Sequence, residues 1–239
     1  MENSPSLFIL AFLTYLSCVP LCVSQSSSEE AAAEEAAEKL LRDTFESEKF
    51  VPEIIPEPPL EQLQVTYNGV NVSLGGLIPF DLAADPPELI WNERDAYYTI
   101  LMTDPDSPSR ADPTEKELEH WVVGNIYKGN ISSGQTFAEY EGPKDSRVYV
   151  DEEGIHRYII SVFEQIGKQN FTGLCINNED ILFRGGFNTS HFVKEHKLKG
   201  PVAATYFTVD HEATKLRPTT TPASPVPNSI QIRDGQIFR

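Results

Sequence analysis

The chain has 239 residues, a formal net charge of −17 and a sequence pI near 4.6. This length fits one domain with additional segments, because domains usually run to about 100–200 residues. The negative charge argues against a nucleic-acid partner, because neutralising phosphates needs a clustered basic face.

Residues 1–24 are typical of a secretory signal peptide. An apolar run from Leu7 to Val23 is broken by Pro20 and followed by small and polar residues, which places cleavage near Ser24. The alternative is a membrane anchor, but an anchor needs about 20 apolar residues and this run is shorter. We therefore expect a secreted, extracellular protein.

Export to an oxidising compartment would expose the chain to glycosylation and disulfide formation. Only Cys175 remains after removal of the signal peptide, so we expect no disulfide framework. Four Asn-X-Ser/Thr sequons predict glycosylation, at Asn71, Asn130, Asn170 and Asn188.

Residues 25–59 form an acidic segment before the domain. Alanine, leucine and glutamate at helical spacing predict an amphipathic helix over 26–49, and either a solvated face or a docking helix fits it. The prolines in 51–59 predict an extended connector, because proline removes backbone donors and disfavours helical geometry in the preceding residue.

Residues 60–212 are predicted to form the globular domain, followed by a Pro/Thr-rich flexible tail at 213–239. Asn68-Gly69 predicts a hairpin, because a type I′ turn needs positive φ at both central residues. Short strands between Pro- and Gly-rich turns favour a mainly β fold, an antiparallel β-sandwich with a few short peripheral helices after Asp112 and Asn188. The predicted strands are 63–74, 88–92, 96–103, 120–127, 155–165 and 201–209.

Polar side chains gather at the ends of three predicted strands. Asp104 follows the run "YYTILM", and the prolines after it stop the strand. His120 begins another strand, while His156 and Tyr158 share one face of a third. Arg157 lies on the opposite face. Spacing alone does not show that these residues converge.

Four blocks resemble the phosphatidylethanolamine-binding protein family, known also through Raf kinase inhibitor protein. They are "YTILMTDPDSPSRADP", "HWVVGNIYKGNISSG", "GIHRYIISVFEQ" and "GPVAATYF", and the match runs from Leu60 to Val209. The resemblance implies a β-sandwich with a small anion-accepting pocket and no metal or cofactor. It places Asp104, Pro108, His120, His156 and Tyr158 around that pocket.

The chemistry of these residues suits a zwitterionic ligand. Imidazoles donate to phosphate oxygens, and a carboxylate orients an imidazole or accepts from an ammonium group. We therefore expect a non-enzymatic binding protein for phosphatidylethanolamine-like headgroups or other phosphorylated ligands, with peripheral membrane contact. The alternative is an extracellular protein-interaction or protease-inhibitor module.

Other interpretations of the same residues remain open. Two histidines and a carboxylate also form the ligand set of non-haem iron, and Ser107 or Ser109 beside His120 would fit a hydrolase, although no G-x-S-x-G elbow accompanies them. Arg110 either binds phosphate or pairs with Asp106 or Asp112.

The chain departs from the family pattern in two places. The loop 142–154 is longer and carries Asp151, Glu152 and Glu153, which would repel an anion. The segment after Val209 is unmatched.

Overall fold

The computed structural model describes residues 19–143, 153–171, 184–212, 232–233 and 236–237. Several features predicted from the sequence lie outside these ranges. They are most of the signal peptide, Cys175, Asp151 and Glu152 of the long loop, and most of the tail. In the described part the chain is mainly β, with two α-helices and two short 3₁₀ turns.

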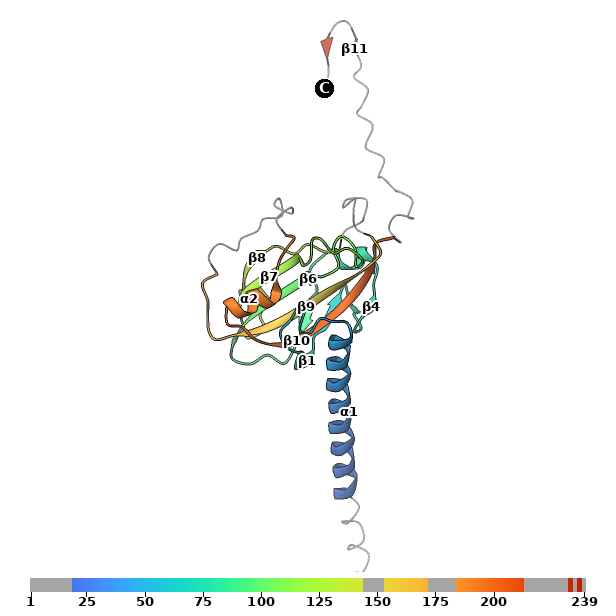
Figure 1. Cartoon of the computed structure of the whole chain (residues 1–239), viewed down its shortest axis with the longest axis vertical. Coiled ribbons are helices and arrows are strands. Elements are labelled where there is room, and N and C mark those ends of the chain that lie inside the picture. The colour runs from blue at the N-terminus through green and yellow to red at the C-terminus, as the bar shows by residue number, and fades with distance from the viewer. Residues whose placement is uncertain (1–18, 144–152, 172–183, 213–231, 234–235, 238–239) are drawn as a thin grey trace, which may run out of the picture.

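Figure 1 shows how these elements are arranged. The helices are α1 (Val19–Ser47) and α2 (Thr189–Glu195), and the 3₁₀ turns are Phe80–Ala83 and Ile131–Ser133. The strands are β1 (Glu61–Gln62), β2 (Gln64–Tyr67), β3 (Val70–Asn71), β4 (Gly76–Leu77), β5 (Glu88–Ile90), β6 (Tyr97–Asp104), β7 (Leu118–Tyr127), β8 (Gln135–Ala138), β9 (Ile155–Gln165), β10 (Lys199–Asp210), β11 (Ile232–Arg233) and β12 (Gln236–Ile237).

The strands of the domain form a large and a small sheet. The large sheet has the order β1-β10-β9-β6-β7-β8, with β4 also paired to β10, and the small sheet has the order β3-β2-β5. The expectation of purely antiparallel sheets does not hold for the large sheet, because β1 and β4 both pair parallel with β10. β10 is 12 residues long, so each of these two-residue strands pairs with a different part of it.

The central strands are buried on both faces, since β6, β7 and β9 are buried along almost their whole length. One apolar cluster contains Leu63, Val65 and Tyr67 of the small-sheet side together with residues of the large sheet. A second cluster lies on the opposite face, where Phe45 from α1 and Phe192 from α2 contribute. The large sheet is therefore the middle layer, between the small sheet and the helices.

Helix α1 is present where the sequence predicts it, but it begins earlier, at Val19. Its last turns dock on the sheet through Leu41 and Phe45, which are 3% and 0% exposed, whereas residues 29–40 are exposed on all sides. Figure 1 shows this part standing away from the domain. No helix in the described ranges is both long and apolar enough to cross a membrane.

The segment after α1 differs from its prediction. Residues 51–57 form turns rather than an extended connector, and the amides of Ile54 and Ile55 donate to the carbonyl of Phe50 (2.8 and 3.0 Å). Both isoleucines are buried in the second apolar cluster. Burial of these two side chains overrides the extended preference that the prolines impose on their neighbours.

Two local predictions are confirmed and one is wrong. The hairpin at Asn68-Gly69 forms with φ of +49° and +78°, and α2 begins after Asn188, whose side chain accepts from the amide of His191 (2.7 Å). The helix expected after Asp112 does not form. Glu117, at the end of that segment, exchanges backbone hydrogen bonds with Phe187 instead. Its amide N–H therefore bonds to a residue distant in the sequence and not within a helix.

Candidate ligand-binding site

The order of the central strands brings the predicted pocket residues together. Asp104 ends β6, which lies between β9 and β7, and His156 and His120 lie near the start of these two neighbours. Both neighbours are antiparallel to β6, so their first residues meet its last one at the same edge of the sheet. Strand order therefore supplies the convergence that spacing alone leaves open.

His156 and Asp104 form the centre of the site. The Nδ1 atom of His156 lies 2.8 Å from Oδ2 of Asp104, and both residues are fully buried. The second oxygen of Asp104 accepts the amide of Asp106 (2.7 Å), which fixes the carboxylate. Nε2 of His156 faces the carbonyl oxygen of Glu153 at 3.1 Å. Both ring nitrogens thus face acceptors, an arrangement that the imidazolium form satisfies.

His120 and Tyr158 extend this centre along the sheet. Their rings meet edge to face with centroids 5.0 Å apart, and Nδ1 of His120 contacts the carbonyl of Glu141. Pro108 lies at the rim of the site: it is half-buried, and its carbonyl accepts the amide of Glu153 (2.9 Å). All five predicted residues therefore lie in one region of the structure.

A further histidine, His211, belongs to the same site, although no local pattern in the sequence predicts it. Its Nε2 lies 2.8 Å from the hydroxyl of Tyr158, and its ring centroid is 4.5 Å from that of His156. Burial is the main cause that lowers the pKa of His211 to about 4; the neighbouring His156 adds to this, while Asp104 opposes it. We call Asp104, His120, His156, Tyr158 and His211 the histidine cluster.

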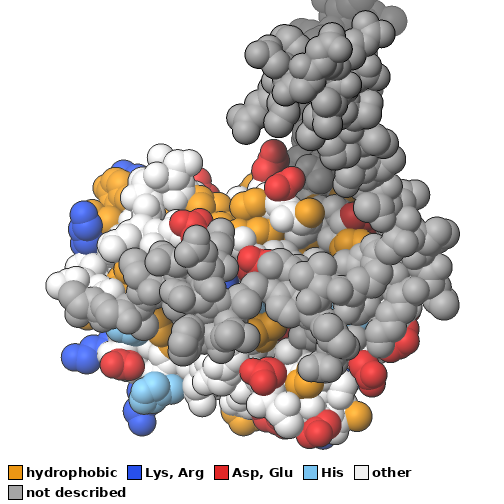
Figure 2. All heavy atoms as spheres, turned by 90° about the horizontal axis from the view of Figure 1, so that it is seen from above, with side chains coloured by type: hydrophobic (Ala, Val, Ile, Leu, Met, Phe, Trp, Pro, Cys, Tyr) orange, Lys and Arg blue, Asp and Glu red, His pale blue; other side chains and the backbone are white. Residues whose placement is uncertain are grey.

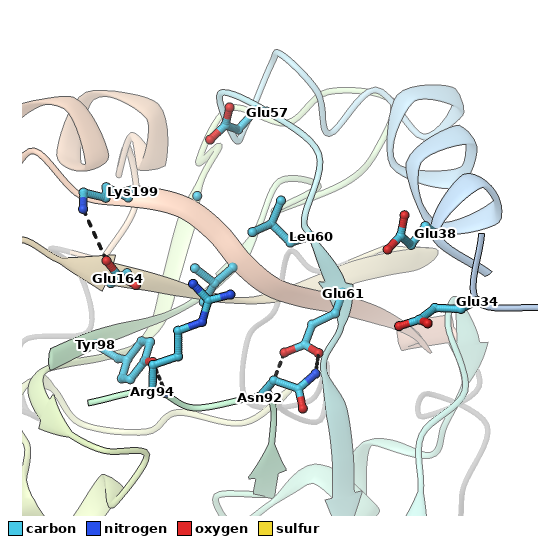
Figure 3. Close-up of a pocket in the computed structure, with 12 residues that line it drawn as sticks. Glu34, Glu38, Glu57, Leu60, Glu61, Asn92, Arg94, Tyr98, Glu164 and Lys199 are labelled. Carbon is cyan, nitrogen blue, oxygen red and sulfur yellow. Dashed lines mark hydrogen bonds and ion pairs between the residues drawn. The ribbon is translucent and has the colours of Figure 1, made fainter. Parts of the chain in front are cut away.

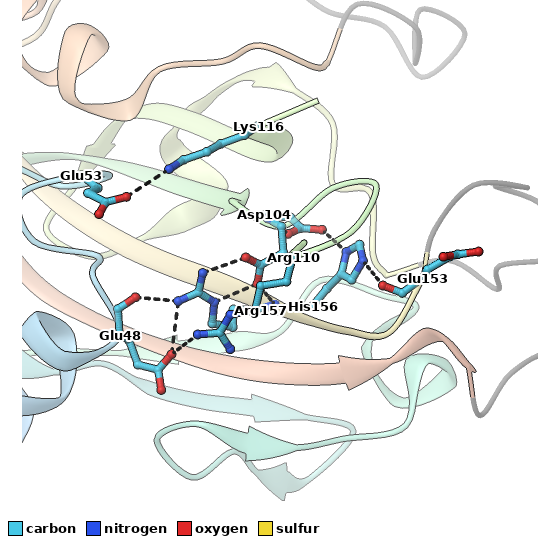
Figure 4. A network of polar contacts seen from close by, with 9 residues as sticks. Glu48, Glu53, Asp104, Arg110, Lys116, Glu153, His156 and Arg157 are labelled. Atoms are coloured by element: carbon cyan, nitrogen blue, oxygen red, sulfur yellow. Dashed lines mark hydrogen bonds and ion pairs between the residues drawn. The ribbon is translucent and has the colours of Figure 1, made fainter. Parts of the chain in front are cut away.

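A second polar network, centred on Arg157, lies beside the cluster (Figure 4). Arg157 follows His156 on β9, so its side chain points to the opposite face of the sheet. Arg157 binds Asp106 as a fork, with Nη2 to Oδ1 at 2.7 Å and Nε to Oδ2 at 2.8 Å. Its Nη1 atom also donates to the carbonyl of Glu48, just after α1 (2.6 Å). Arg110 pairs with the carboxylate of Glu48 (3.1 Å), a partner that the sequence alternatives of phosphate, Asp106 or Asp112 did not include. Arg110 braces the N-terminal segment against the turn.

Arg184 fixes the start of β7 behind His120. Its buried guanidinium donates to the carbonyl oxygens of Glu119, His120 and Glu139, at 3.2, 3.3 and 2.9 Å. Burial raises the pKa of the Glu119 carboxyl to about 7, although the charge of Arg184 acts in the opposite direction. These residues position His120 through its backbone.

A groove of about 530 Å³ lies elsewhere, between α1 and the β1–β10 edge of the large sheet (Figure 3). It contains none of the cluster residues. Lys199 binds Glu164 (3.3 Å), and Glu61 binds the amide of Asn92 (2.7 Å). The groove is acidic and does not suit an anion; its carboxylates are Glu34, Glu38, Glu57, Glu61 and Glu164.

The described residues hold no group of three or more His, Cys, Asp or Glu side chains arranged to bind a metal ion. Ser109, one of the two serines considered for a hydrolase, accepts the amide of Asp112 on its hydroxyl oxygen (3.2 Å). Its contact is that of a turn residue.

Comparison with known proteins places the chain in a family. Residues 54–207 match the family model described as phosphatidylethanolamine-binding protein. A relative from Drosophila melanogaster, "Putative odorant-binding protein A5", is 29% identical over 197 residues, which is 82% of this chain and 87% of the relative. The chain belongs to the phosphatidylethanolamine-binding protein family.

Two solved structures share the fold. One is carboxypeptidase Y inhibitor complexed with its cognate proteinase, with a TM-score of 0.59 and 21% identity over 72% of this chain and 95% of the other. The second is phosphatidylethanolamine-binding protein from Plasmodium vivax, with a TM-score of 0.54 and 22% identity over 70% and 95%.

The lowered pKa of His211 predicts a loss of stability in acid. The unfolded chain takes up a proton near pH 6.5, but the folded chain does so only near pH 4, so folding becomes less favourable as pH falls between these values. The full effect is about 3 kcal/mol. We expect urea unfolding to show a smaller difference between pH 7 and pH 4.5 for His211→Phe than for the wild type. An equal pH dependence in both proteins would contradict the prediction.

Proposed function

We propose that the chain is a secreted, non-enzymatic binding protein whose histidine cluster accepts a phosphate group, with phosphoethanolamine headgroups as the ligand class. The observation that supports this most is the convergence of the cluster: His156 binds Asp104, His211 lies against His156, and both His120 and His211 contact Tyr158. Imidazole N–H groups donate to phosphate oxygens, and charge-assisted bonds of this kind are the stronger ones.

The surface of the protein is acidic, so recognition of a phosphate depends mainly on short-range hydrogen bonds from the imidazole N–H groups. On the face seen in Figure 2, acidic side chains lie among hydrophobic ones, and the basic side chains gather at one edge. With a net charge of −17, the protein does not attract anions at long range. An ammonium group on the ligand would offset this repulsion, which favours a zwitterionic headgroup over free phosphate.

Calorimetry with phosphoethanolamine tests the proposal. We expect His156→Gln to weaken binding about 10- to 100-fold, since it removes a charged hydrogen bond worth roughly 1.5–3 kcal/mol. His191→Gln is the matched control, because His191 lies exposed on α2. Equal affinity in the wild type and His156→Gln would contradict the proposal.

Further arms of the same experiment separate the sources of the phosphate. Inorganic phosphate and ethanolamine measure the two halves of the headgroup. Sedimentation with phosphatidylethanolamine or phosphatidylcholine vesicles tests peripheral membrane contact. Binding of phosphate as tight as that of phosphoethanolamine would restrict the ligand class to anions.

Export is supported by the apolar N-terminal run and by the four sequon asparagines, Asn71, Asn130, Asn170 and Asn188, all of which are exposed in the structure. We expect the full chain, expressed in insect cells, to be recovered from the medium with a mass that falls on treatment with an N-glycosidase. Retention of unglycosylated protein inside the cells would contradict export.

Protein interaction is a second candidate function, favoured by the exposed half of α1 and the acidic groove at its base. One of the structural neighbours, 21% identical, is an inhibitor bound to a proteinase. If this chain acts similarly, it should inhibit carboxypeptidase Y, and Glu34→Lys with Glu38→Lys should alter the inhibition. The control is Glu29→Lys with Glu30→Lys, which changes the net charge by the same amount at two residues that do not line the groove. Full carboxypeptidase activity at saturating protein would count against inhibition of this enzyme.

A further inference from the structure

The turn at Glu153-Gly154, directly before β9, is hydrogen-bonded to three residues in or beside the histidine cluster: Pro108, His156 and His211. The amide of Glu153 donates to the carbonyl of Pro108 (2.9 Å). The carbonyl of Gly154 accepts the amide of His211 (2.8 Å). The carbonyl of Glu153 faces Nε2 of His156 at 3.1 Å. These two residues therefore join the loop after β6, the start of β9 and the end of β10.

The contact with His156 involves the nitrogen that a ligand would use. Nδ1 of His156 is held by Asp104, and this pair is fully buried. An anionic oxygen must therefore approach Nε2, where the carbonyl of Glu153 already accepts. A peptide carbonyl and a phosphate oxygen are both acceptors, so the two compete for the same proton.

We propose that the binding site blocks itself: the Glu153 carbonyl takes the place of a ligand oxygen on His156, and binding requires release of the 153–154 turn. This inference rests on the proposed function. The apparent ligand affinity is then the intrinsic affinity multiplied by the fraction of molecules in which the turn is released. The phosphate prevails because its charged oxygen makes a stronger bond to an imidazolium than a neutral carbonyl does.

Gly154 offers a way to disturb the turn without touching the pocket. Its φ is +80°, a conformation that glycine adopts without strain, and a Cβ built on it meets no atom of the described residues within 4 Å. Alanine at this position would strain the closed turn through the backbone alone. Glu153 is exposed, so the turn lies at the protein surface.

We expect Gly154→Ala to bind phosphoethanolamine about tenfold more tightly than the wild type, because strain in the closed turn raises the released fraction. Gly69→Ala is the matched control. Gly69 has a φ of +78° and lies in the β2–β3 hairpin, and a Cβ added to it likewise meets no atom within 4 Å in the part of the chain that the structure describes. Its affinity should equal that of the wild type.

Amide hydrogen exchange gives a second measurement without ligand. The amide of Glu153 donates from the turn to Pro108, and the amide of His211 donates to Gly154 in the turn. Both amides should therefore exchange faster in Gly154→Ala, and both should exchange as slowly in Gly69→Ala as in the wild type. Addition of phosphoethanolamine to the wild type should also speed exchange at these two amides.

The outcomes separate the two hypotheses. Unchanged or weaker binding by Gly154→Ala, while the wild type binds, would overturn the self-blocking turn and leave the proposed function standing. Unchanged exchange at both amides in Gly154→Ala would overturn it as well. Absence of binding in the wild type and in Gly154→Ala, together with faster exchange in the variant, would instead contradict the proposed function.

Discussion

The buried ion pair between Asp106 and Arg157 is the constraint that shapes the binding site. Asp106 lies two residues after Asp104, and Arg157 lies one residue after His156. Successive side chains of a strand point to opposite faces, so His156 and Arg157 of β9 face apart. β6 ends at Asp104, and the bend at 105–108 lets Asp106 bind Arg157 on one face while Asp104 binds His156 on the other. The pair costs desolvation, yet loss of one partner leaves a buried charge and costs about 3–5 kcal/mol. The geometry of the site thus depends on charges that face away from it.

The same guanidinium connects the site to the N-terminal segment. Arg157 donates to the carbonyl of Glu48, and its guanidinium carbon lies 4.8 Å from the ring centroid of Phe50. Phe45 of α1 packs against Phe50 and Tyr206 in the second apolar cluster. The region before the family match is therefore part of the folded unit, and it supports the site from behind.

Much of the site was predictable because its residues lie in local patterns. Asp104 followed by prolines, and His156 and Tyr158 spaced by two, are visible in the chain, and the order of the strands explains their convergence. His211 was missed because its signal is not local: it follows β10, whose antiparallel register with β9 sets Val209 opposite His156. β1 and β4 were missed because two residues show no alternation. The turns at 51–57 were missed because the prolines indicated an extended chain, whereas burial of Ile54 and Ile55 decides the local conformation.

The exposed half of α1 also affects how the protein behaves as a particle in solution. At 1.5 Å per residue, the twelve exposed residues 29–40 extend about 18 Å beyond the docked turns. Alanine and glutamate sustain a helix without tertiary contacts better than most residues do. Such an arm increases hydrodynamic drag, so the monomer should elute from a sizing column ahead of a compact protein of the same mass. Early elution is therefore weak evidence for a dimer, and oligomeric state needs a measurement that reports mass independently of shape.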